Sequence, residues 1–85
     1  MIIQLHKTFK KQYEKLTQAQ KRKFKERRTI FLQDEFNPIL NNHALKGKYQ
    51  GYRSINITGD IRVIYINSSE DRVFVKIGSH GKLYG

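Results

Sequence analysis

The sequence has no cysteine and no tryptophan, and it contains one methionine and one proline in 85 residues. Without cysteine, neither a disulfide framework nor a thiolate zinc site can hold the fold, so apolar packing must do so. No apolar run approaches the length of a membrane span, and the first apolar stretch is too short for a secretory signal. We therefore expect a cytoplasmic protein with no membrane association, in which residues 1–85 form a single domain around one modest core.

Acidic residues are also scarce: 17 Lys and Arg stand against 7 Asp and Glu, which gives a formal net charge of +10. Residues 1–28 carry most of this excess, with ten Lys and Arg against two Glu. Such a positive field attracts a phosphate backbone, an anionic membrane or an acidic protein partner, and charge alone does not choose among them. A merely solubilising surface is the simpler alternative.

The beginning of the chain predicts a short strand followed by a helix. Residues 2–6 alternate apolar and polar side chains, which indicates a strand. Apolar residues then recur at i, i+4 and i+7, the spacing of one helical face, at Phe9, Tyr13 and Leu16. We expect this helix to run for about two turns, with Thr8 as its N-cap.

A second and longer helix is expected from Gln18 to Phe36. Thr17 can cap its start, and the pair Asn37-Pro38 stops it, because the residue before a proline is pushed out of the helical region. Arg27 and Arg28 lie between two phenylalanines of this helix. Their stems either cover the hydrophobic seam, or their guanidinium groups reach past its edges to meet carboxylates of a partner.

Three β-rich runs follow a polar connection over residues 41–47. Short turns separate the runs, which suits antiparallel hairpins in a meander. The runs are Tyr52–Ile57, Ile61–Asn67 and Arg72–Ile77. We predict an α+β fold with the order β-α-α-β-β-β, in which the helical hairpin packs on one face of a small antiparallel sheet and the other face stays polar.

Period two assigns the side chains of the last strand to faces. Val73, Val75 and Ile77 are expected on one face, and Phe74 and Lys76 on the other. The same alternation applied to the first meander strand separates its arginine and isoleucines from its serine and asparagine. The polar side chains would then gather on the face that the helices leave open.

Three side chains carry the chemistry of this face. His80 and Tyr84 lie four residues apart just beyond the last strand. An imidazole can take or give a proton near neutral pH, and an aromatic ring offers a flat surface for a base, so the pair suggests RNA chemistry. A solvated tail is the alternative. Arg62 lies in the otherwise apolar central strand, and a buried cation needs a partner or a purpose.

Four motifs in order resemble the RelE/ParE superfamily of bacterial toxins, and most closely the messenger-RNA endoribonucleases of the YafQ type. They span residues 42–85, about the second half of the chain, and the β-α-α start agrees with the opening topology of the family. The motifs are Asn42-His43-Ala44-Leu45-Lys46-Gly47, Gly51-Tyr52-Arg53, Asp60-Ile61-Arg62-Val63-Ile64-Tyr65 and Gly78-Ser79-His80-Gly81-Lys82-Leu83-Tyr84-Gly85.

The resemblance implies a RelE-like fold and a small toxin of a type II toxin–antitoxin system. Such a toxin cuts mRNA, typically in the ribosomal A site, and an antitoxin with an acidic or amphipathic segment holds it inactive. Its partners would be the antitoxin, mRNA and the ribosome. The resemblance implies no metal and no cofactor.

The resemblance also assigns site residues. His80 matches a histidine that handles the proton of the 2′-hydroxyl or of the leaving 5′-oxygen, and His43 matches a second histidine of the family. Asp60 matches an acidic residue at the start of the central strand. Arg62 matches the arginine that RelE-like and YoeB-like members use against the scissile phosphate, and Tyr84 matches an aromatic position.

The chain departs from the pattern in the first meander strand. Several YafQ-type members carry a further histidine and an acidic residue there, where this chain has Asn56 and Ser54. We expect Asn56, Lys76, Lys82 and Arg53 to bind the substrate together with the aromatic position.

The chemistry of the residues supports a similar site without the resemblance. RNA cleavage through its own 2′-hydroxyl needs a group that takes that proton, a group that returns one to the leaving oxygen, and positive charge against the phosphorane. His80, His43 and Arg62 can fill these roles, and the sequence does not say which histidine is the base. Asp60 could orient a histidine, act as the base, or only cap its turn. His43 could equally be an ordinary loop residue, and Tyr84 could only pack on the sheet.

Two functions from other classes remain as alternatives. A ParE-like toxin would bind and inhibit DNA gyrase without cleaving RNA, but it would not need His80 and Tyr84. A plain RNA-binding module would have more aromatic side chains on the open face of the sheet. The three histidines are widely spaced and form no common metal-binding pattern.

Overall fold

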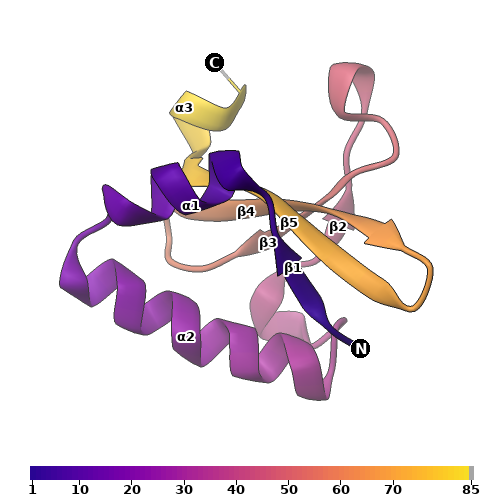
Figure 1. Cartoon of the computed structure of the whole chain (residues 1–85), viewed down its shortest axis with the longest axis horizontal. Coiled ribbons are helices and arrows are strands. Elements are labelled where there is room, and N and C mark those ends of the chain that lie inside the picture. The colour runs from indigo at the N-terminus through magenta and orange to yellow at the C-terminus, as the bar shows by residue number, and fades with distance from the viewer. Residues whose placement is uncertain (85) are drawn as a thin grey trace.

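The computed structural model describes residues 1–84 as two helices, a five-stranded sheet and a short C-terminal helix (Figure 1). The elements are β1 (Ile3–Leu5), α1 (Lys7–Glu14), α2 (Gln18–Gln33), η1 (Pro38–Leu40), β2 (His43–Ala44), η2 (Gly47–Tyr49), β3 (Arg53–Asn56), β4 (Ile61–Ser68), β5 (Asp71–Ser79) and α3 (His80–Tyr84). The predicted α+β fold with its helical hairpin is confirmed. None of these helices is long and apolar enough to cross a bilayer.

The sheet has the strand order β1-β5-β4-β3-β2 and is mixed, not purely antiparallel as predicted. The meander of β3, β4 and β5 is antiparallel, but β1 pairs with β5 in parallel. Tight hairpins force the antiparallel direction, whereas the long connection through two helices and three strands leaves the direction of β1 free. The expected polar connection also contains a strand, because His43 and Ala44 of β2 pair with Ser54 and Arg53 of β3.

The first helix begins one residue before the predicted cap. His6 is the N-cap of α1, and its Nδ1 accepts a hydrogen bond of 3.0 Å from the backbone amide of Thr8. His6 therefore has a structural role at the start of α1. The short α1 packs mainly on β5, which places it beside the end of the chain (Figure 1).

The second helix begins where predicted and ends early. The Thr17 hydroxyl accepts a hydrogen bond of 3.1 Å from the amide of Gln20, and the Gln20 side chain accepts one of 2.9 Å from the amide of Thr17. This capping box satisfies two free amides at the helix start. The helix ends at Gln33, not Phe36, because Asp34 already takes an extended conformation with φ −155° and ψ 95°.

Aromatic rings fill the core between the helices and the sheet. Phe74 of β5 lies at its centre, with ring centroids of four neighbours between 5.4 and 6.1 Å away. These neighbours are Phe9 of α1, Phe24 and Phe31 of α2, and Tyr65 of β4. All five rings are nearly inaccessible to solvent, so this cluster holds both helices on one face of the sheet.

A β-bulge changes the expected faces of β5. Ile64 of β4 pairs with Lys76, but the next residue, Tyr65, pairs with Phe74, which leaves one extra residue on β5. Phe74 and Ile77 therefore both face the helices and belong to the same core. The prediction that they lie on opposite faces is wrong, because the extra residue breaks period two.

The sheet face opposite the helices is partly covered. Ile64 and Ser54, which are paired across β3 and β4, have no exposed surface. The η2 segment contacts α3: the Tyr49 hydroxyl donates a hydrogen bond of 3.1 Å to the carbonyl oxygen of Leu83. This contact fixes the C-terminal helix beside the strands that carry the polar side chains.

Candidate active site

A pocket of about 380 Å³ opens between β2, β3, β4 and α3. Four of the side chains that the sequence singled out line it: His43, Arg62, His80 and Tyr84. The remaining lining residues are Asn41, Leu45 and Ser54. The structure thus brings together two imidazoles, a guanidinium and an aromatic ring from distant parts of the chain.

His43 stands at the exposed edge of the sheet on β2. Asn41 precedes it in the left-handed conformation, with φ 46°, and the Asn41 carbonyl oxygen lies 2.9 Å from Nδ1 of His43. A carbonyl oxygen can only accept a hydrogen bond, so Nδ1 of His43 carries the proton of the neutral ring. The lone pair on Nε2 is then free to act as a base.

Arg62 enters the pocket from β4 and is tied to the turn that precedes its strand. Its Nη1 donates a hydrogen bond of 2.9 Å to the carbonyl oxygen of Thr58 and a longer one of 3.4 Å to that of Ile61. Within residues 1–84 this guanidinium forms no salt bridge. Its donors that face the pocket can therefore meet an anion from outside the chain.

His80 is the first residue of α3, so the extended backbone of β5 ends before it. Its backbone amide donates a hydrogen bond of 3.0 Å to the carbonyl oxygen of Asp60. The exposed imidazole leans on the ring of Tyr84, with centroids 4.8 Å apart and planes inclined by 50°. The Tyr84 hydroxyl is buried and has no hydrogen-bond partner within the described part of the chain.

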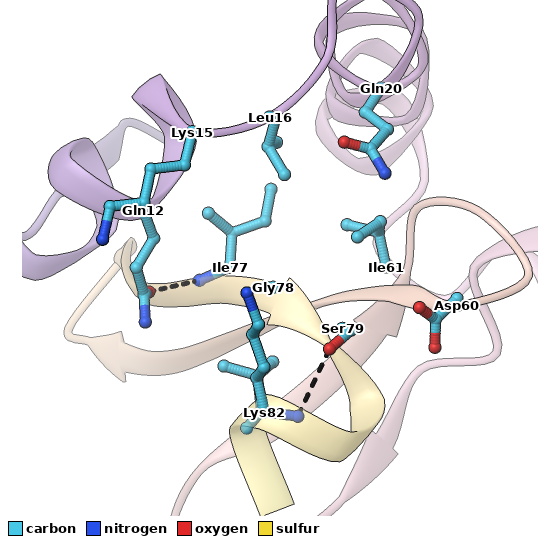
Figure 2. Close-up of a pocket in the computed structure, with 11 residues that line it drawn as sticks. Gln12, Lys15, Leu16, Gln20, Asp60, Ile61, Ile77, Gly78, Ser79 and Lys82 are labelled. Atoms are coloured by element: carbon cyan, nitrogen blue, oxygen red, sulfur yellow. Dashed lines mark hydrogen bonds between the residues drawn. The ribbon is translucent and has the colours of Figure 1, made fainter.

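Asp60 and Lys82 lie apart from this group. Both line a second pocket of about 320 Å³, which opens between α1, the start of α2 and α3. Figure 2 shows Lys15 and Gln20 on the helical side of this pocket and Lys82 on the opposite side. Asp60 contacts His80 through its backbone carbonyl oxygen, and within residues 1–84 its carboxylate accepts no hydrogen bond from the imidazole.

Lys76 belongs to a chain of contacts that ends at the active-site pocket. Its Nζ lies 3.0 Å from the Tyr49 hydroxyl, and the Tyr49 ring meets the Tyr84 ring edge-on at 5.9 Å. Sequence reasoning missed Tyr49, because a single half-buried tyrosine in a short turn carries no periodic signal. It also missed Ser54, a fully buried residue whose hydroxyl has no partner within residues 1–84, although its alternation with Arg53 placed it on the correct face.

Arg53 and Asn56 are not among the residues that line the His43 pocket. Arg53 faces the helical side, where its Nε donates a hydrogen bond of 2.7 Å to Oδ1 of Asn42 and its guanidinium lies 5.2 Å from the centre of the Phe36 ring. Asn56 is paired with Arg62 across β3 and β4, and its side chain is half-buried. Of the expected substrate-binding residues, only Tyr84 lines the pocket itself.

A network of partly buried polar groups holds the segment before β2. Glu35 accepts two hydrogen bonds from Arg72, of 2.9 and 3.0 Å, and one of 2.6 Å from the Tyr65 hydroxyl. Partial burial opposes ionisation of Glu35, but these hydrogen bonds outweigh it and hold the pKa of its carboxyl below the ordinary value. Burial and the hydrogen bond to Glu35 raise the pKa of Tyr65 to about 12, so its hydroxyl keeps its proton.

No three His, Asp or Glu side chains within residues 1–84 lie close enough together to hold a metal ion. The pocket nevertheless offers two groups that can transfer protons and one fixed cation. This arrangement can cleave a phosphodiester that has a neighbouring hydroxyl group, if the phosphate lies against Arg62.

Comparisons with known proteins show the family and the fold of the chain. The sequence model of the family described as "Bacterial toxin of type II toxin-antitoxin system, YafQ" matches residues 1–85. The chain is similar to YafQ from Escherichia coli strain BL21(DE3), with 24% identity, 98% of this chain and 97% of that chain covered, and a TM-score of 0.78. A comparison with curated proteins finds no match.

Two further solved structures are similar. A chain of the E. coli DinJ-YafQ complex has 26% identity, with 98% of this chain and 97% of that chain covered and a TM-score of 0.75. The YoeB/ParE toxin from Agrobacterium tumefaciens has 22% identity, with 94% and 99% covered and a TM-score of 0.76. The fold is therefore RelE/YoeB-like.

Proposed function

The chain belongs to the YafQ family of bacterial toxins of type II toxin–antitoxin systems, and we propose that it is an endoribonuclease that cleaves mRNA by metal-independent acid–base catalysis. The observation that carries this proposal is the common pocket of His43, Arg62 and His80. Residues 1–85 act as one toxin domain in the cytoplasm, where mRNA and ribosomes are found.

The three side chains take separate roles in the reaction. Nε2 of His43 accepts the proton of the 2′-hydroxyl, because Nδ1 of the neutral ring is committed to the Asn41 carbonyl oxygen. The 2′-oxygen attacks the adjacent phosphorus, and the bond from phosphorus to the 5′-oxygen breaks. His80 gives a proton to that leaving oxygen, and Arg62 stabilises the extra charge on the phosphorane.

The surroundings of the pocket suit a single-stranded RNA. Tyr84 offers a ring on which a base can stack beside the scissile phosphate. The basic residues 1–28 supply the long-range attraction to a large polyanion, which fits ribosomal RNA around an mRNA in the A site. Lys76 stands at the end of the Tyr49–Tyr84 contacts and can meet a neighbouring phosphate.

The regulatory partner is an antitoxin. The similar E. coli chain occurs in a DinJ-YafQ toxin-antitoxin complex, which makes a protein partner of this kind the expected one here. The second pocket is lined by apolar side chains, among them Leu16, Ile77 and Leu83, and by the two lysines Lys15 and Lys82. An amphipathic segment with carboxylates would match both features.

Cleavage can be tested with matched histidine variants. His80→Asn removes the proposed acid, while His6→Asn makes the same change at the N-cap of α1, where asparagine can still accept the capping hydrogen bond. Each form is expressed in cells, and mRNA ends are mapped by primer extension. We expect new ends inside reading frames with the wild type and with His6→Asn, and a loss of at least about a hundredfold with His80→Asn.

Product chemistry tests the mechanism on programmed ribosomes and on free RNA oligonucleotides. Attack by the 2′-hydroxyl leaves a 2′,3′-cyclic phosphate or 3′-phosphate and a 5′-hydroxyl, and a 2′-deoxy nucleotide at the scissile position should block the reaction. Cleavage of a free oligonucleotide should survive EDTA. Intact mRNA together with DNA damage would instead indicate gyrase inhibition, and 5′-phosphate products would contradict the proposed mechanism.

A further inference from the structure

Asn42 lies at the centre of a hydrogen-bond network on the helical side of the sheet. Its Nδ2 donates to the Tyr65 hydroxyl at 2.8 Å and to the carbonyl oxygen of Glu35 at 3.1 Å, and its Oδ1 accepts from Nε of Arg53 at 2.7 Å. Through Tyr65 the network continues to the carboxylate of Glu35, which Arg72 binds with two nitrogens. Both amide hydrogens of the Asn42 side chain can therefore be satisfied by partners of fixed position.

The next residue in the chain is His43, whose side chain lines the pocket of the opposite face. The left-handed Asn41 turns the backbone just before the network, and its carbonyl oxygen lies 2.9 Å from Nδ1 of His43. The edge strand β2 is only two residues long: His43 and Ala44 pair with β3, and the Leu45 amide donates one more hydrogen bond of 2.9 Å to the carbonyl oxygen of Tyr52. On the N-terminal side of His43, the Asn42 side chain adds its three hydrogen bonds to this short pairing.

We propose that Asn42 is a positioning residue, which holds the Asn41 carbonyl oxygen against Nδ1 of His43 and so presents the Nε2 lone pair to the substrate. Asn42 does not touch the RNA in this proposal. It acts through the backbone, since successive residues of an extended segment point to opposite faces. The inference rests on the proposed endoribonuclease function for its catalytic consequence, but the state of the His43 ring can be measured without any cleavage.

The first test is nitrogen-15 NMR of the full chain, which distinguishes a protonated Nδ1 from a protonated Nε2 in each neutral histidine. We expect His43 of the wild type to carry its proton on Nδ1. Asn42→Ala should shift this ring toward a mixture of both tautomers, whereas Gln12→Ala should leave it unchanged. Gln12 is the matched control, because its half-buried amide side chain accepts a backbone hydrogen bond of 2.9 Å from Ile77 and does not line the His43 pocket.

The second test is the rate of RNA cleavage. Asn42→Ala should lower kcat by roughly tenfold to a hundredfold with little change in KM, since the base is misplaced but the RNA-binding groups remain. Tyr65→Phe removes the hydroxyl between Glu35 and Asn42 but keeps the core ring, so its loss of kcat should be smaller. It replaces Asn42→Ala as the test variant if that variant does not fold. Gln12→Ala should cleave at the wild-type rate.

The outcomes separate the inference from the proposed function. If the wild type does not cleave RNA but Asn42→Ala changes the His43 tautomer, the positioning stands and the proposed reaction fails. If the wild type cleaves RNA and its His43 proton lies on Nε2, the inference is wrong. It is equally wrong if both Asn42→Ala and Tyr65→Phe keep the wild-type tautomer and kcat.

Discussion

The imidazole of His80 and the ring of Tyr84 lie one turn apart on α3, with their centroids 4.8 Å from each other. Tyr84 in turn meets Tyr49, whose hydroxyl is bonded to the carbonyl oxygen of Leu83. The proposed general acid is thus supported by an aromatic ring that is itself held in place. This support matters because α3 has five residues and is too short to be rigid without tertiary contacts.

Substitutions of Tyr84 should separate its ring from its hydroxyl. Tyr84→Phe removes a buried hydroxyl that has no partner within residues 1–84, so cleavage and stability should stay close to the wild type. Tyr84→Ala removes both the stacking surface and the support of His80, so kcat/KM should fall by roughly tenfold to a hundredfold. Steady-state cleavage of a short RNA measures kcat/KM for the two variants. Equal losses in the two variants would assign the role to the hydroxyl instead.

Arg62 should be needed for the transition state more than for binding. Arg62→Gln removes the charge and keeps a hydrogen-bond donor only on a shorter side chain, so kcat should fall by about a hundredfold while KM changes little. Arg62→Lys restores the charge without the planar fork and should recover part of the rate. Arg22→Gln, on the exposed surface of α2, is the control and should keep kcat. Equal kcat for Arg62→Gln and the wild type would remove Arg62 from the mechanism.

The fold was predictable where local signals and the tertiary structure agree. The Thr17 cap and the three meander strands carry strong local signals, and all are present. The direction of β1 and the bulge before Ile77 depend on pairing between distant segments, and no local pattern records them. The β2 strand also escaped prediction, since two residues are too few to show alternation.

The candidate site, like the fold, was predictable from residue identity but not where it depends on the tertiary structure. His43, Arg62, His80 and Tyr84 were proposed from the resemblance and their chemistry, and all four line one pocket. The sequence alone could not show that Lys82 and His80 line different pockets, because they lie only two residues apart in one short helix. Only the turn of α3 after β5 decides which side chain faces which pocket.

The placement of Lys82 leads to a prediction about the partner. Lys82→Glu reverses a charge in the lining of the second pocket, so the affinity for the antitoxin should fall by about tenfold or more, equivalent to roughly 1.4 kcal/mol. RNA cleavage by the free toxin should change by much less, because Lys82 does not line the His43 pocket. Isothermal titration with the cognate antitoxin and a cleavage assay check the two halves. A selective loss of cleavage would return Lys82 to the substrate-binding residues.

The ion pair between Glu35 and Arg72 should make stability depend on pH in the acidic range. Its two side chains are only 11% and 17% exposed, and they join at 2.9 Å. Removing the carboxylate leaves the largely buried Arg72 guanidinium without its charged partner, so Glu35→Gln should lower the free energy of unfolding by roughly 1–3 kcal/mol at neutral pH. Glu26→Gln is the control, because its pair with Lys23 is 3.6 Å long and exposed and should contribute about 0.5 kcal/mol at most.

The sign of the pH effect follows from the lowered pKa of Glu35. Unfolding returns this carboxyl to its ordinary value of 4.5, so its contribution to stability is complete above that pH and is lost as the pH falls through the lower folded value. Urea unfolding between pH 7 and pH 3 should therefore show a smaller loss of stability for Glu35→Gln than for the wild type and Glu26→Gln. Parallel curves for all three proteins would mean that Glu35 has the same pKa in the folded and unfolded states, and that the anchor of the Asn42 network does not depend on its charge.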